Sequence, residues 1–210
     1  MRKRSCSGLT QTLLAMALAL SIAPHAASAE RASRGAPRAE LAAALRGIDD
    51  AVPAELLWRL GGNDTVRHLK AIARDEAMAG AIRLRATASL HTLGDAAALA
   101  ACTALADDAA LPTRLRWHAA YGAVVLAGRL DAAQALALVS RWLQVKRTAA
   151  SARRLDVAAG GQADLAEAAV RGLRHVPGPA ALRLLRSAQG DPRQTVRDAA
   201  HAVLRRRPGR

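Results

Sequence analysis

A segment near the carboxyl end, residues 191–204, constrains the fold more than any other part of this 210-residue chain. It opens with an Asp-Pro turn, continues with apolar residues at helical spacing, and carries an Arg in its first turns. Partial copies lie upstream, so that Arg85 and Arg116 stand 31 positions apart, as do Ala168 and Ala199. A period of this length is typical of stacked helical hairpins, which present a surface and usually contain no catalytic pocket.

The composition predicts an all-α protein. Ala and Leu dominate, β-branched residues are few, and no run alternates between apolar and polar residues. Gly, Pro and Asp recur at short intervals, which indicates short helices and tight turns. We expect a flexible leader at residues 30–36 and then a short helical cap at 37–63, with helices at 37–48 and 53–60.

Residues 64–210 predict about four helical hairpins. Gly94 and Gly128 are expected just past helix ends, where Gly relaxes the left-handed conformation. Asp95 and Asp131 are expected to cap the helices that follow them. The predicted helix pairs are 65–76 with 80–93, 96–107 with 113–127, 132–145 with 164–175, and 179–188 with 192–206.

This arrangement resembles the HEAT-repeat family, bacterial HEAT-like proteins in particular, over roughly residues 64–210. Residues 191–204 carry the resemblance best, with Asp at the turn, Val196-Arg197 at the helix start and Ala199-Ala200 in mid-helix. The other repeats depart from it, since Ala166 stands where the third repeat would carry its Arg. The resemblance implies a right-handed α-solenoid that acts as a binding scaffold.

Residues 1–29 predict a cleaved secretory signal peptide of bacterial type. A basic start precedes an uncharged apolar stretch, and Ala27-Ser28-Ala29 supplies the small residues that a signal peptidase reads. An uncleaved signal anchor is the alternative, because residues 8–29 carry no charge and are long enough to span a bilayer. We therefore expect an exported protein, periplasmic or secreted, with no transmembrane segment after cleavage.

The charge favours anionic partners. The 31 basic and 17 acidic residues give a formal net charge of +14, and cleavage at residue 29 removes Arg2, Lys3 and Arg4 to leave +11. Such a field attracts acidic proteins, anionic lipid and anionic polysaccharide. Nucleic-acid binding is disfavoured, because a chain with three Trp, one Tyr and no Phe offers few stacking platforms.

An insertion interrupts the third repeat. Arg116 and Ala166 stand 50 positions apart instead of 31, so about 19 extra residues fall near 144–162, and insertions in repeat proteins often lie on the binding face. We interpret this segment, which also holds Gly160-Gly161 as a hinge, as the first candidate for partner binding. A solvated loop without a ligand is the equal alternative. The basic candidates in it are Lys146, Arg147, Arg153 and Arg154.

The aromatic residues predict two different roles. Trp117 and Tyr121 lie one turn apart in a nearly all-apolar helix, a pattern that favours core packing. Trp142 stands at the end of its helix, beside Arg141 and the insertion, and is the candidate interface anchor. Cys102 lies in an apolar run and is expected to be a small buried residue rather than a reactive thiol.

Arginines recur on the second helices of the hairpins, which line the concave face in the family that this chain resembles. A basic strip there would suit an acidic partner, and Arg193 and Arg197 are its partner-binding candidates. The alternative, favoured for Arg85, Arg116 and Arg197, is a structural ladder in which each Arg pairs with a turn Asp such as Asp108 or Asp191. The remaining arginines of the set are Arg83 and Arg114.

The sequence gives no support for catalysis, a metal or a cofactor. The histidines after residue 29 never fall within four residues of one another, and no nucleophile elbow, phosphate loop or dinucleotide fingerprint is present. We expect a non-catalytic, exported HEAT-like scaffold that binds a protein of the cell envelope. The alternative is a binder of anionic lipid or polysaccharide through the basic face, and an unrecognised enzyme is the third hypothesis.

Overall fold

The structure, a computed structural model, describes residues 37–47, 52–144 and 160–206. Every regular element in these ranges is a helix, which confirms the predicted all-α class. Residues 37–44 form the first helix. The elements that follow are α2 (Ala54–Gly61), the 3-10 turn η1 (Gly62–Asp64), α3 (Thr65–Arg74), α4 (Gly80–Leu93), α5 (Ala96–Asp107), α6 (Thr113–Leu130), α7 (Ala132–Gln144), α9 (Gly160–Gly172), the 3-10 turn η2 (Leu173–His175), α10 (Pro179–Ala188) and α11 (Gln194–Arg206).

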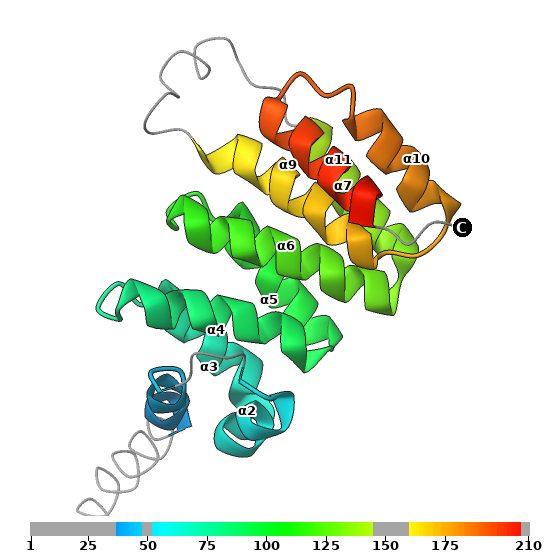
Figure 1. Cartoon of the computed structure of the whole chain (residues 1–210). Coiled ribbons are helices and arrows are strands. Elements are labelled where there is room, and N and C mark those ends of the chain that lie inside the picture. The colour runs from blue at the N-terminus through cyan, green and yellow to red at the C-terminus, as the bar shows by residue number, and fades with distance from the viewer. Residues whose placement is uncertain (1–36, 48–51, 145–159, 207–210) are drawn as a thin grey trace, which may run out of the picture.

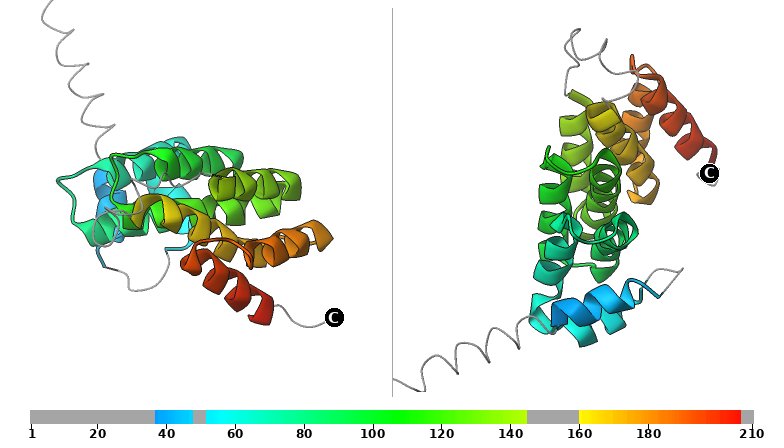
Figure 2. Two further views of the ribbon diagram at one scale, coloured as in Figure 1. Left: turned by 90° about the horizontal axis from the view of Figure 1, so that it is seen from above. Right: turned by 90° about the vertical axis from the view of Figure 1, so that its left-hand side faces the viewer.

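The helices pack in successive pairs. α3 packs against α4, α5 against α6, α7 against α9, and α10 against α11. The second members of these pairs also contact one another, α4 with α6, α6 with α9 and α9 with α11. In Figure 1, α4, α6 and α9 follow one another from the bottom to the top of the view, and Figure 2 gives the arrangement from two further sides. The second helices therefore form one layer, in which α6 and α9 each lie between two other second helices.

Several predicted helix bounds are confirmed, because the signals that set them are local. The observed limits of α4, α5 and α10 agree with the predicted ones at both ends. Gly94 ends α4 with a φ of 80°, the left-handed conformation expected there. Asp95 caps α5, because its carboxylate accepts a hydrogen bond from the amide of Ala98 at 2.6 Å. Asp131 accepts from the amide of Ala133 at 2.9 Å in the same way at the start of α7.

The prediction that Gly128 lies past a helix end is wrong. α6 continues through it to Leu130, and the amide of Asp131 still donates to the carbonyl of Ala127 at 2.7 Å. A Cβ on Gly128 would lie only 2.8 Å from Cγ2 of Val176. This Gly therefore serves packing, since the missing side chain lets α6 approach the segment after η2.

Two further glycines bring neighbouring helices close to α6. A Cβ at Gly172 would lie 2.8 Å from Cβ of Val124, so α9 touches α6 almost backbone to backbone. A Cβ at Gly122 would lie 3.2 Å from Cβ of His91, which marks a similar approach of α6 to α4. Buried Ala residues continue these contacts, and the fully buried leucines fill the space between the helix layers.

The third pair differs from its prediction at the insertion. α9 begins at Gly160 instead of residue 164, so the Gly160-Gly161 pair interpreted as a hinge forms the first turn of that helix. The rest of the predicted insertion, residues 145–159, lies outside the described residues. Within the described ranges, every helix is too short or too polar to cross a lipid bilayer.

Candidate functional site

The predicted interface anchor Trp142 is part of the core. It is only 3% exposed, and its indole Nε1 donates to Oδ1 of Asp107 at 3.1 Å. Arg141 donates to the same carboxylate at 2.8 Å, and its guanidinium carbon lies 5.1 Å from the centre of the Trp142 ring. Trp142 therefore joins α7 to the end of α5, and too little of its surface is accessible to anchor a partner.

Arg193, a predicted partner-binding residue, is also internal. Its side chain is 6% exposed and pairs with the Asp191 carboxylate at 2.6 Å, while Nη2 also donates to the Leu143 carbonyl at 3.0 Å. Burial would raise the pKa of Asp191, but the hydrogen bonds and charge from Arg193, with the charge of Arg197, outweigh burial and hold that pKa below 3.8. Arg197 donates to the carbonyls of Asp191 and Pro192. Both arginines therefore stabilise the turn between α10 and α11.

Two arginines of the earlier second helices, Arg83 and Arg116, bind backbone carbonyls. Nε of Arg83 donates to the Ala73 carbonyl and Nε of Arg116 to the Ala106 carbonyl, each at 3.0 Å and each ten residues back along the chain. Both carbonyls lie at the end of the first helix of their pair, where acceptors lack helical partners and the helix dipole is negative. The predicted pairing with a turn Asp is therefore not seen at Arg116, which binds the Ala106 carbonyl, while Asp108 pairs with Arg74 at 2.8 Å.

Four of the candidate partner-binding residues cannot be placed. Lys146, Arg147, Arg153 and Arg154 all lie in residues 145–159, outside the described residues. The basic insertion therefore remains a prediction from the sequence, and the structural site described below is independent of it.

One hollow in the described part of the chain lies where α6, η2 and the ends of α9 and α11 meet. It encloses about 230 Å³, and we call it the Trp117 pocket. Its walls combine two aromatic rings from α6, two small apolar side chains from α11, and one arginine each from α9, η2 and α11. The lining residues are Trp117, Tyr121, Arg171, Arg174, Ala202, Val203 and Arg206.

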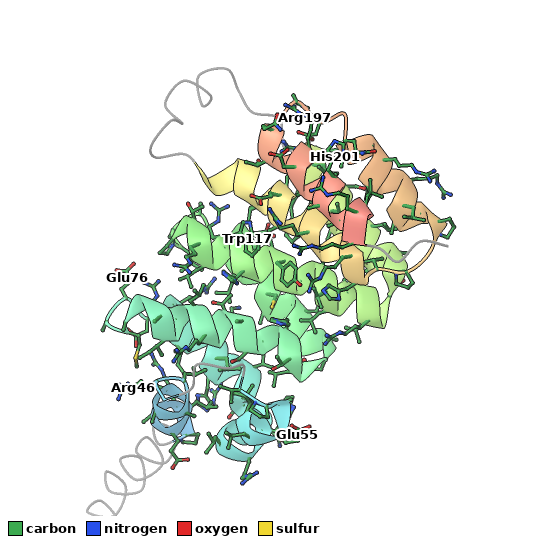
Figure 3. All side chains as sticks on the ribbon, in the orientation of Figure 1. Arg46, Glu55, Glu76, Trp117, Arg197 and His201 are labelled. Carbon is green, nitrogen blue, oxygen red and sulfur yellow. The ribbon has the colours of Figure 1, made fainter. Side chains whose placement is uncertain are left out.

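The two aromatic rings of the pocket hold each other in place. Trp117, labelled on α6 in Figure 3, stacks on Tyr121 with ring centroids 5.9 Å apart and an interplanar angle of 6°. The Tyr121 ring also meets His91 and His175 edge to face, at 6.3 Å and 6.1 Å. The predicted core packing is correct in part, since both rings pack against the core, but each keeps part of its surface exposed.

A hydrogen bond orients the Tyr121 hydroxyl. Its oxygen lies 3.0 Å from Nε2 of His175, which also accepts from Nε of Arg174 at 2.6 Å. A guanidinium can only donate, so this Nε2 carries no proton, and its single lone pair is shared between Nε of Arg174 and the Tyr121 hydroxyl. Burial, and then the charges of Arg174 and Arg129, lower the pKa of His175, in agreement with a neutral ring.

The positive charge of the pocket comes from its arginines. Burial lowers the pKa of His91 and of His118, with further lowering by Arg129 and Arg114 respectively, so these rings are neutral near pH 7. Glu167 offsets one cation, since it accepts from Nε of Arg171 at 2.7 Å. The remaining lining cations, Arg174 and Arg206, are exposed at the rim.

Most residues of this site carry no clear signal in the sequence. Arg171, Arg174 and Arg206 are not among the candidate residues that the sequence suggests. One signal was available, because Arg171 and Arg174 recur at a spacing of three at a helix end, as neighbours on one helix face do. Nothing in the sequence placed α11 opposite Trp117.

The described residues contain neither a metal-binding cluster nor an ionised thiol. In the described part of the chain, His, Cys, Asp and Glu side chains do not gather in threes that could hold a metal ion. Cys102 is buried, as predicted, and burial raises the pKa of its thiol to about 12, which keeps it protonated. No protein-family model matches the chain, and no curated protein is similar to it.

Proposed function

We propose that this chain is an exported, non-catalytic scaffold that binds a protein of the cell envelope. In this proposal the four helix pairs are HEAT-like repeats of a right-handed α-solenoid, and their second helices form the binding surface. The export signal in residues 1–29 and the repeat pattern support the location and the architecture.

The Trp117 pocket is the observation that carries the binding function. It is a hollow on the surface of the second helices, with a preformed aromatic pair at its floor and arginines at its rim. Aromatic and Arg side chains are the types most enriched among residues that dominate protein interfaces. By contrast, Arg193 and Trp142 are already satisfied inside the protein.

Binding of anionic lipid or polysaccharide is the second candidate, and the net charge of +14 favours it. Exposed arginines such as Arg114, Arg183 and Arg186 add to the basic surface outside the pocket. A general basic surface binds through charge alone, so its affinity falls steeply with salt. It does not require the aromatic pair, which is why we rank protein binding first.

In-cell photocrosslinking tests the proposed function. A photoreactive residue at Arg114, Ala202 or Arg147 samples the second-helix surface, the pocket and the predicted insertion in turn. We expect a defined protein adduct from at least one position, which the substitution Arg174→Glu or Arg154→Glu abolishes. Adducts with lipid or glycan alone, or no specific adduct from any position, would overturn the protein-scaffold proposal.

A further inference from the structure

We propose that the Trp117 pocket binds an acidic segment of a protein partner, with one large apolar side chain inserted against Trp117 and flanking carboxylates on Arg174 and Arg206. This inference rests on the proposed function and goes further, because it names the class of ligand and the residues that recognise it.

The size of the pocket favours a single side chain. Sites for cofactors and other small molecules enclose roughly 300–1,000 Å³. The Trp117 pocket encloses about 230 Å³, below that range, and has room for one aromatic or large aliphatic group. Its apolar walls, formed by Trp117, Ala202 and Val203, suit burial of such a group.

The aromatic pair is held in place before any ligand arrives. Stacking on Trp117, edge contacts with His91 and His175, and the hydroxyl bond to His175 fix the Tyr121 ring from several sides. A preformed surface loses little side-chain freedom when a ligand binds, so more of the contact energy appears as affinity.

The charges around the pocket select an acidic ligand. All the charged residues that line it are arginines, and the internal carboxylate of Glu167 pairs with only one of them. Nε of Arg174 is bonded to His175, which orients its guanidinium. An oriented guanidinium binds a carboxylate through paired hydrogen bonds, which are about twice as strong as bonds between neutral groups.

Fluorescence anisotropy of a synthetic peptide tests this inference on the purified protein. The probe is a fluorescein-labelled peptide in which one phenylalanine lies between two pairs of aspartates. We expect saturable binding that weakens about tenfold with Arg174→Glu or Arg206→Glu, as loss of a charge-assisted hydrogen bond implies. Both residues are exposed, so these variants should fold, and thermal unfolding checks that they do.

Matched controls separate the pocket from the general charge. Arg205→Glu makes the same charge change on the same helix, outside the pocket lining, and should weaken binding less than threefold on the basis of long-range charge alone. Replacing the peptide phenylalanine by alanine should weaken binding about tenfold, because an aromatic anchor is lost. Trp117→Ala should have a similar effect, with Trp117→Phe restoring part of the affinity.

Three results would overturn the inference: no saturable binding at low salt, equal binding of the alanine peptide, or an equal loss with Arg205→Glu. Anionic phospholipid vesicles that bind through Arg174 and Arg206 while the peptide does not would also overturn it. The proposed scaffold function would survive these failures if photocrosslinking from Arg114 or Arg147 still captured a defined protein. Failure of both experiments would remove the function as well.

Discussion

Trp142 and Trp117 both lie next to arginines, but the two rings differ in exposure and in how completely the neighbouring arginines are paired within the chain. At Trp142, one carboxylate from a distant helix, Asp107, accepts hydrogen bonds from both the indole and Arg141, and the ring is 3% exposed. At Trp117, the nearby arginines are only partly neutralised by Glu167, and the ring borders a cavity. We call the Trp142 cluster the closed region, because its donors are bonded within the chain. We call the Trp117 pocket the open region, because Arg174 and Arg206 are exposed there. Residue type alone therefore does not separate a structural cluster from a binding surface.

Replacing each Trp by Ala should give the largest difference between the two regions. We expect Trp142→Ala to lower the free energy of unfolding by about 3–5 kcal/mol, because it leaves a cavity in the core. Trp117→Ala should cost only about 1–2 kcal/mol, since part of its ring is already exposed. Urea unfolding measures both values. Equal losses would mean that Trp117 is a core residue like Trp142, and the contrast would fail.

The close approach of α9 to α6 at Gly172 should give the second-largest effect on stability. Gly172→Ala places a Cβ 2.8 Å from that of Val124, so α9 must move away from α6. We expect a loss of about 1–3 kcal/mol in unfolding free energy, together with weaker binding of the acidic peptide. Gly80→Ala is the control, because it meets open space at a helix start and should stabilise by about 0.5–1 kcal/mol. A neutral Gly172→Ala would contradict the close packing.

Removing the carboxylate of each region sharpens the comparison further. Asp107→Ala leaves the indole of Trp142 without its acceptor and should cost about 1–2 kcal/mol. Glu167→Ala removes a partly exposed pair one helical turn apart and should cost about 0.5 kcal/mol or less. Glu167→Ala should also tighten binding of the acidic peptide, because it unmasks Arg171. Weaker peptide binding in that variant would argue against charge selection at the pocket.

The smallest expected effect is a difference in pH dependence between the two regions. The pKa values of His91, His118 and His175 lie below 6.5 in the folded state, so the unfolded chain takes up protons first as the pH falls. These histidines therefore do not reduce the free energy of unfolding above about pH 6.5. Below that value the free energy of unfolding declines as the pH falls toward their folded-state pKa values. His91→Gln should flatten the decline, measured by thermal unfolding between about pH 7.5 and pH 5.

Asp191, beside the closed region, responds at lower pH. Its folded-state pKa lies below 3.8, so its contribution is present above that value and is lost as the pH falls through the folded pKa. The variant Asp191→Asn should therefore change the acid limb of the stability curve and leave the slope near pH 6 unchanged. A change near pH 6 would show that the two regions are coupled.

The site divides into residues that the sequence could and could not locate. Trp117 and Tyr121 were recognisable as neighbours one turn apart, because helical spacing is a local property. The core packing predicted for both rings is correct in part, whereas Trp142 is more buried than its role as an interface anchor requires, because its hydrogen-bond acceptor lies 35 residues away at Asp107. Helical periodicity indicates which face is apolar, and it contains no information about which apolar face a distant segment covers.

The sequence by itself determined the all-α class, the bounds of α4, α5 and α10, and caps such as Asp95, because these depend on interactions within about four residues. Only the tertiary structure decided that Gly128 lies inside a helix, that Arg193 is buried, and that α11 completes a pocket over Trp117. Those outcomes depend on how closely helices approach, and contacts between segments far apart in the chain set that distance.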